Sequence, residues 1–186
     1  MIVWLNGPFG GGKSILSAAL AGALDGAVVA DPEEVGDLLR RPLGGHRLLT
    51  RDYQELPPWR EVTLALVTGL ARYTGGPVLV PMSVLDRART ERLLGSLRAS
   101  GLSVHHLILH TAPEVLHQRI ADSCKFPGDE PRSGAVRAYR RRRAADYFTA
   151  AATWMHASGH VIDTTALSPE QTLRLTLTHL AHATST

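Results

Sequence analysis

Residues 7–14 read Gly7-Pro8-Phe9-Gly10-Gly11-Gly12-Lys13-Ser14, and this short stretch decides the fold class. It matches the pattern G-x-x-x-x-G-K-[ST] at every fixed position. An apolar run precedes it and a helix-forming run follows it, which is the context of a phosphate loop. In such a loop, backbone N–H groups and the amino end of the next helix bind a polyphosphate. The glycines are needed because side chains would keep the backbone away from the anion.

The loop predicts ATP and Mg²⁺ as cofactors. Lys13 is expected to reach the β- and γ-phosphates, and Ser14 is expected to hold the metal ion. The expected cofactor contacts of the loop are Gly7, Pro8, Phe9, Gly10, Gly11, Gly12, Lys13 and Ser14. The alternative is a glycine turn with an incidental lysine, and the strand-like run before it and the helical run after it disfavour that interpretation.

Outside the loop, short apolar runs alternate with longer helical stretches. Strands are expected at residues 2–5, 27–30, 78–80, 104–109 and 160–162. Helices are expected at residues 13–24, 32–40, 57–73, 87–100, 113–122, 136–157 and 169–182. This alternation predicts an α/β fold with a parallel sheet covered on both faces. We expect a three-layer P-loop sandwich with strand order 2-3-1-4-5, similar to nucleoside-monophosphate kinases and carrying a lid.

Length and composition indicate one ordinary globular domain over residues 1–186, with 44% hydrophobic and 20% charged residues. No apolar stretch approaches the roughly 20 residues that a membrane helix needs. The single cysteine, Cys124, excludes an intrachain disulfide and fits a reducing compartment. We therefore expect a cytoplasmic protein without a stable membrane anchor, as a monomer or homodimer. The polar stretch 125–134 is expected to be a mobile loop within a lid at about residues 123–140.

Basic side chains gather in the second half of the chain, where seven arginines lie between Arg119 and Arg143. Such a cluster is compatible with nucleic acid, with polyphosphate, or with a solvated helix face. The stretch is not an aromatic-rich basic patch, which argues against nucleic acid. For Arg137 and for residues 140–143 a solvated face is the expected role. Arg119 and Arg132 are instead expected to neutralise charge on a transferred phosphate.

A carboxylate is also required for a kinase, and the sequence offers Asp31 at the end of the second strand. It could accept the proton of a substrate hydroxyl or share the metal with Ser14, and it is equally a good N-cap before Pro32. The third strand ends without an acid, and Asp86 beyond it is expected to cap the next helix. The base-reading Asn-Lys-x-Asp pattern of GTPases is absent. After the fifth strand, Asp163 and Thr164 are expected beside adenine.

Several segments together resemble the bacterial tunicamycin resistance proteins. The similarity lies in Ile2-Val3-Trp4-Leu5-Asn6-Gly7, Asp31-Pro32-Glu33 with Gly36, Asp52-Tyr53-Gln54 through Trp59-Arg60, Val80-Pro81-Met82 and Val104-His105-His106. These segments span about residues 1–120 in the order expected for that family.

The resemblance implies an ATP-binding protein that protects bacteria from tunicamycin, a uridine-like nucleoside antibiotic with a fatty acyl chain. Two mechanisms are open: ATP-dependent phosphorylation of the small molecule, or ATP-dependent binding without chemistry. An apolar groove for the substrate is expected at Tyr53, Trp59, Arg60 and Met82. For Trp59 the alternative is simple packing against the sheet.

Overall fold

Five parallel strands form one sheet in the order β2-β3-β1-β4-β5 in the computed structural model, which describes residues 1–184. The strands are β1 (Ile2–Asn6), β2 (Val28–Val29), β3 (Val78–Pro81), β4 (Val104–His110) and β5 (His160–Asp163). β1 lies at the centre, where Trp4 pairs in register with Val80 of β3 and His106 of β4. The predicted parallel sheet and its strand order are confirmed.

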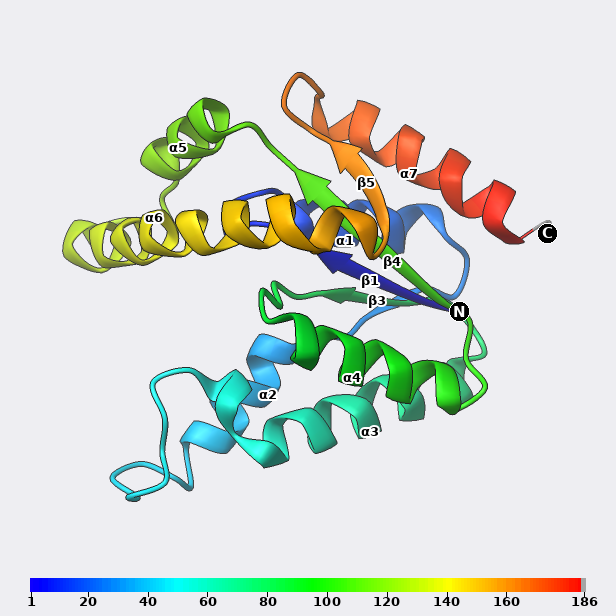
Figure 1. Ribbon diagram of the computed structural model, residues 1–186, viewed down its shortest axis with the longest axis horizontal. Helices are drawn as coiled ribbons and strands as arrows, with labels where there is room; N and C mark the ends of the chain where they lie inside the picture. The colour runs from blue at the N-terminus through cyan, green and yellow to red at the C-terminus, as the bar shows by residue number, and fades with distance from the viewer. Residues whose placement is uncertain (185–186) are drawn as a thin grey trace.

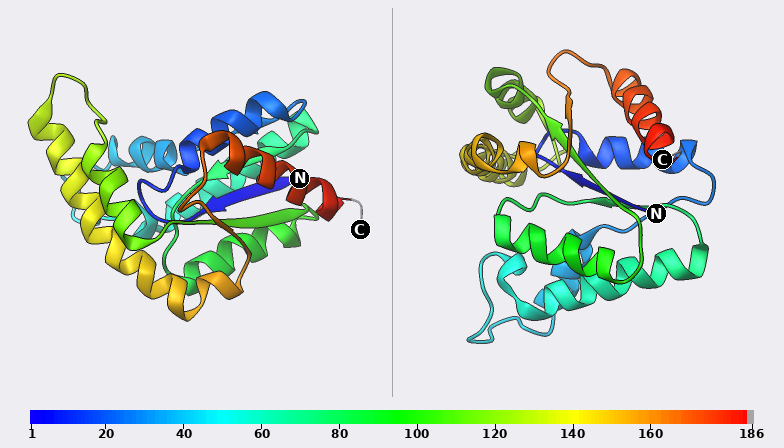
Figure 2. Two further views of the ribbon diagram at one scale, coloured as in Figure 1. Left: turned by 90° about the horizontal axis from the view of Figure 1, so that it is seen from above. Right: turned by 45° about the vertical axis from the view of Figure 1, so that its right-hand side comes forward.

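Helices cover both faces of this sheet and give the three layers. They are α1 (Lys13–Ala23), α2 (Pro32–Arg40), α3 (Pro57–Thr74), α4 (Arg87–Ala99), α5 (Pro113–Asp122), α6 (Glu130–Thr153) and α7 (Pro169–Thr184). α1 and α7 lie on one side of the sheet, and α3 and α4 lie on the other (Figure 2). The strands run with their carboxyl ends toward α5 and α6, on the side opposite the two termini (Figure 1).

Alternate residues of β1 point into two separate apolar cores, as the two-residue period of a strand requires. Ile2 and Trp4 pack with α3 and α4, where Trp59 and Leu93 are fully buried. Val3 and Leu5 pack with α1 and α7 in the second core. Because both faces are covered, the central strand is apolar along its whole length until Asn6.

Several helices begin directly after a polar residue whose side chain accepts a hydrogen bond from a backbone N–H of the first turn. Asp86 caps α4 by accepting a hydrogen bond from the Arg89 N–H at 2.7 Å, as expected. At α7, Ser168 and Gln171 bond each other's backbone N–H groups in a capping box. Within residues 1–184, none of the helices has the length and apolarity to cross a membrane.

The segment expected to be a mobile loop is partly helical. α6 begins at Glu130 rather than at residue 136, because Asp129 accepts a hydrogen bond from the Arg132 N–H at 3.0 Å and Pro131 suits the first turn. The Ser133 hydroxyl also bonds the backbone of Phe126 and folds the preceding turn onto the helix. α6 then ends at Thr153, and a short 3₁₀ helix (Met155–Ala157) replaces its expected last turn.

Candidate functional site

The phosphate loop connects β1 to α1 and contains three glycines with positive φ. These are Gly7 at 134°, Gly10 at 85° and Gly12 at 92°, a conformation that L-residues rarely adopt. Gly7 has a second constraint, since a Cβ there would lie 2.5 Å from the backbone oxygen of Leu109 on β4. The loop therefore needs glycine for its backbone conformation and for its close approach to the sheet.

A buried polar network fixes the beginning of this loop. Asn6 Oδ1 accepts hydrogen bonds from the backbone N–H groups of Gly7 and Val84, at 2.9 and 3.1 Å. Asn6 Nδ2 lies 3.3 Å from Nε2 of His106, whose Nδ1 lies 3.1 Å from the Ser158 carbonyl oxygen. These contacts are satisfied by a neutral imidazole with its proton on Nδ1, and burial lowers the pKa of His106 accordingly.

Lys13 lies inside the loop as its principal positive charge. Its Nζ donates to the carbonyl oxygens of Pro8 at 2.8 Å and Gly7 at 3.4 Å. Burial lowers the pKa of Lys13 to about 8, although the negative charge of Glu33 opposes this shift. The ammonium group is therefore desolvated, and an anion bound in the loop would complete its hydrogen bonds.

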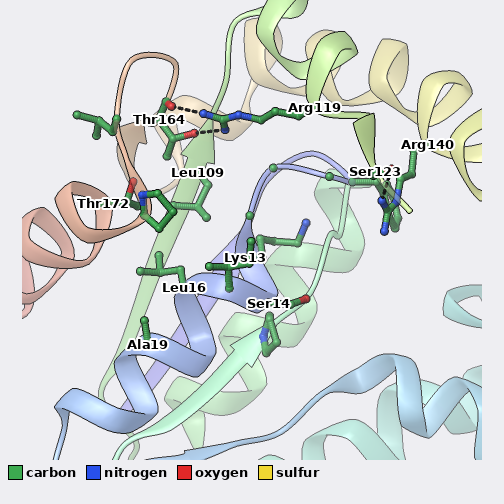
Figure 3. A pocket seen from close by; sticks show the side chains of 18 of the residues that line it. Lys13, Ser14, Leu16, Ala19, Leu109, Arg119, Ser123, Arg140, Thr164 and Thr172 are labelled. Atoms are coloured by element: carbon green, nitrogen blue, oxygen red, sulfur yellow. Dashed lines mark hydrogen bonds between the residues drawn. The ribbon is translucent and has the colours of Figure 1, made fainter. Parts of the chain in front are cut away.

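A cavity of about 580 Å³ opens directly above the loop, between α1, α5, α6, the turn after β5 and the start of α7 (Figure 3). Residues Phe9 to Ser14 of the loop line it, together with Arg119, Arg140 and Lys125. Glu33 and Asp122 are its carboxylates. Lysines and arginines thus outnumber the carboxylates, and the cavity fits a polyphosphate in size and in charge.

Arg119 and Arg140 reach the cavity from different helices (Figure 3). The Arg119 guanidinium donates to the Thr164 carbonyl oxygen at 2.6 Å and to the Thr164 hydroxyl at 3.1 Å, which fixes it beside the turn after β5. Arg140 donates to the Ser123 hydroxyl at 3.0 Å. Each arginine is held by hydroxyl or carbonyl oxygens and keeps its full charge for an anionic ligand.

The residues of the structure also suit a magnesium ion. Ser14 lines the cavity and its side chain is exposed. Within residues 1–184 there is no group of three or more His, Cys, Asp or Glu side chains that could hold a metal by themselves. Mg²⁺ is usually bound by few protein ligands together with substrate phosphates. Binding of the ion by Ser14 together with the phosphates of a nucleotide therefore fits the residues present, whereas a site made of protein carboxylates alone does not.

Asp31 caps α2, which is one of the roles expected from its position before Pro32. Its Oδ1 accepts a hydrogen bond from the Glu33 N–H at 2.9 Å at the start of α2, and Pro32 occupies the first turn. Burial raises the pKa of Asp31, and the bond from Glu33 opposes that shift. Asp31 is not among the residues that line the cavity, whereas Glu33 is.

Other expected site residues lie away from the cavity. Arg132 is exposed and places its guanidinium 3.7 Å from the ring centre of Phe126. Asp163 is exposed and bonds the N–H and hydroxyl of Thr165, which lowers the pKa of Asp163. Its neighbour Thr164 does line the cavity.

The expected substrate groove is not assembled as a surface. Trp59 and Met82 are fully buried in the core, and the Trp59 indole N–H donates to the Pro32 carbonyl oxygen at 2.9 Å. Arg60 lines a separate groove between α3 and α4. Tyr53 is half-buried, with its ring centre 5.8 Å from that of Trp59 and its face against Gly36. The alternative for Trp59, packing in the core, is the one observed.

Four charged residues of the cavity were not expected there: Glu33, Asp122, Lys125 and Arg140. A sequence signal existed for Arg140, because it shares a helical stripe with the buried residues Ala144, Tyr147 and Ala151. Glu33 lies two residues after Asp31 within the first turn of α2, where an acid also complements the helix dipole. Because the helix dipole already explains an acid at this position, the sequence gives no separate signal that Glu33 lines the cavity.

Nucleotide affinity should depend on pH through Lys13. Because its pKa is about 8 in the folded protein, raising the pH from 7 to 9 removes its charge and should weaken ATP binding roughly tenfold. The unliganded fold should respond oppositely: its stability rises as pH increases from about 8 toward the ordinary lysine value, because only the unfolded chain retains the proton. Calorimetric titrations across this range test the affinity, and a flat profile contradicts the assignment.

Comparison with known proteins also indicates a nucleotide-binding P-loop fold. The AAA domain family matches residues 2–143 of the chain. A solved tunicamycin resistance protein from Deinococcus radiodurans is 29% identical with a TM-score of 0.68, and the match covers 97% of this chain and 95% of that one. The resemblance seen in the sequence is therefore confirmed. No curated protein sequence matches the chain.

Two kinases share the fold at lower identity. A gluconokinase from Sinorhizobium meliloti has a TM-score of 0.62 and 21% identity, and the match covers 97% of this chain and 91% of that one. A sugar kinase from a Janibacter species has a TM-score of 0.65 and 19% identity, with 97% and 94% covered. At such identities the likeness concerns the kinase-like P-loop fold alone.

Proposed function

Since this chain belongs to the AAA domain family and has a kinase-like P-loop fold, we propose that it is an ATP-dependent phosphotransferase acting on tunicamycin or a similar nucleoside antibiotic. The observation that supports this most is the composition of the cavity. One space joins the phosphate loop to charged side chains from α2, α5 and α6, which is what transfer of a phosphate between two ligands requires.

In this proposal the loop N–H groups and Lys13 bind the β- and γ-phosphates, and Ser14 contributes to holding Mg²⁺. When bound, the metal ion neutralises charge on the transferred phosphate. Arg119 is fixed beside Thr164 and orients the nucleotide from the side of β5. Arg140 lies on the other side of the cavity and counters the negative charge that develops there. Residues 123–140 act as the lid that brings Arg140 and Lys125 to the phosphates.

The substrate is assigned by similarity, since the D. radiodurans protein at 29% identity is a tunicamycin resistance protein. The second candidate is ATP-dependent sequestration of the drug. It is favoured by the ends of two strands: β3 ends without a carboxylate, and Asp31 after β2 is engaged as a helix cap. Both mechanisms require ATP, and they differ only in whether its phosphate is transferred.

Resistance in cells should depend on the phosphate loop in either mechanism. Cells expressing the wild-type chain should tolerate more tunicamycin than cells carrying an empty vector. Cells expressing Lys13→Ala at the same protein level should be as sensitive as that control, because ATP binding is lost. The measurement is the minimum inhibitory concentration with protein levels checked by immunoblot. Equal protection by the variant would contradict a role for ATP.

A further inference from the structure

Three acidic residues stand at the beginning of α2, Asp31, Glu33 and Glu34, and of these only Glu33 lines the cavity above the phosphate loop. We infer that Glu33, rather than Asp31, is the catalytic carboxylate that takes the proton of the acceptor hydroxyl during phosphoryl transfer. This inference rests on the proposed phosphotransferase function. It reassigns a role for which the position of Asp31 after β2 is the more obvious choice from sequence.

The first step of the argument is the geometry of the helix start. Asp31 has extended backbone angles, and its Oδ1 accepts the Glu33 N–H at 2.9 Å, while its backbone oxygen accepts the Glu34 N–H at 3.2 Å. One carboxylate oxygen of Asp31 is thus committed to the cap. The same bond fixes the backbone of Glu33. The Glu33 carboxylate is not the N-cap of α2, because Asp31 has that role.

The second step is the place of each side chain. Glu33 is a lining residue of the cavity that contains Lys13 and Arg140, and Asp31 is not. Of these two carboxylates, Glu33 also has the stronger electrostatic interaction with Lys13. Glu33 therefore shares the cavity with the lysine that is expected to bind the β- and γ-phosphates.

The third step is rigidity, which a proton acceptor needs in order to be aligned. The Pro32 carbonyl oxygen accepts the Trp59 indole N–H at 2.9 Å, which ties the first turn of α2 to α3. One turn later the Tyr53 ring packs on Gly36, where a Cβ would lie only 2.5 Å from a ring carbon. The buried Trp59 and the half-buried Tyr53 thus hold the helix that carries Glu33, which gives both aromatic residues a positioning role.

The chemistry then balances with the groups present. Glu33 accepts the proton of the acceptor hydroxyl as the oxygen forms its bond to the γ-phosphorus and the bond from that phosphorus to the β–γ bridging oxygen breaks. The electron pair of the broken bond stays on ADP, and Glu33 releases the proton to water afterwards. General-base help of this kind contributes roughly 100-fold to 10,000-fold to a rate.

The test compares Glu33→Gln with Glu34→Gln, a matched change at the next residue, which is exposed and does not line the cavity. Glu33→Gln should lower the rate of drug phosphorylation about 100-fold or more. Glu34→Gln should stay within about twofold of wild type. Asp31→Asn should lose less activity than Glu33→Gln, because asparagine caps a helix as well as aspartate does. The melting temperature of each variant shows that it is folded.

One further readout separates this inference from the proposed function. Slow ATP hydrolysis without drug uses water as the acceptor, and it should fall about tenfold or more in Glu33→Gln. The same hydrolysis should stay within about twofold of wild type in Glu34→Gln.

The outcomes are distinct. If wild type phosphorylates the drug and Glu33→Gln does so within about threefold of wild type, Glu33 is not the base, and a large loss in Asp31→Asn would assign that role to Asp31. If wild type leaves the drug unchanged but hydrolyses ATP in a Glu33-dependent way, the proposed substrate is wrong and the role of Glu33 stands. If wild type binds ATP without either reaction, both are overturned.

Discussion

Replacement of Lys13 by alanine is expected to weaken ATP binding by roughly 100-fold or more, the largest effect on ligand binding that we predict. The physical reason is the burial of its ammonium group, which donates to the carbonyl oxygens of Gly7 and Pro8. A phosphate bound in the loop meets this charge in a desolvated setting, where charge-assisted hydrogen bonds are strong. Isothermal titration calorimetry with Mg·ATP measures the change directly.

A control for this variant is Arg141→Ala. Arg141 is also cationic, but it is exposed on α6 and does not line the cavity. Its replacement should alter ATP affinity by no more than about twofold. If Lys13→Ala bound ATP as tightly as wild type, or if both variants lost affinity equally, the assignment of the phosphate loop would be wrong.

Gly7→Ala should have the largest effect on stability. The added Cβ would lie 2.5 Å from the Leu109 oxygen, and the φ of 134° is unsuited to alanine. Either β4 or the loop must move, and we expect the free energy of unfolding to fall by about 3 kcal/mol or more. ATP binding should be lost at the same time, because the displaced N–H groups no longer surround a phosphate. Urea denaturation with calorimetry measures both effects.

Gly22→Ala is the matched control. Gly22 lies within α1, and a Cβ there would meet no atom within 4 Å. Alanine should therefore raise the free energy of unfolding by about 0.5–1 kcal/mol, since it restricts the unfolded chain and favours helix. A Gly7→Ala protein as stable as Gly22→Ala would show that the loop does not hold the described conformation.

Most of the fold could be predicted because its signals are local. The strand at 2–5 is apolar throughout, since both of its faces are buried, and the loop after it adds a fixed turn into α1. The helix start after Asp86 followed from capping chemistry. The start of α6 was missed because a stretch rich in proline and charge is typical of a loop. In the structure Asp129 caps the helix, and the Ser133 hydroxyl bonds the Phe126 carbonyl oxygen in the preceding turn.

Outside the phosphate loop, Arg119 and Thr164 are the expected site residues that line the cavity. Arg140 belongs to a run of arginines that reads as a solvated face, and only the packing of Ala144 against Leu116 and Ile120 of α5 turns Arg140 toward the cavity. Trp59 reads as a ligand-binding aromatic, yet its N–H finds the Pro32 carbonyl oxygen inside the core. Such outcomes depend on tertiary contacts between distant segments, which a single sequence does not display.

The most direct test of the proposed function is mass spectrometry of tunicamycin after incubation with the purified protein and Mg·ATP. A parallel reaction with Lys13→Ala controls for contaminating kinases. We predict a drug species carrying one added phosphate, formed only with the wild-type protein and accompanied by an equal amount of ADP. The contrary result is drug that remains unmodified after incubation with Mg·ATP and is recovered bound to the ATP-loaded protein. That result would contradict phosphotransfer and leave sequestration as the mechanism.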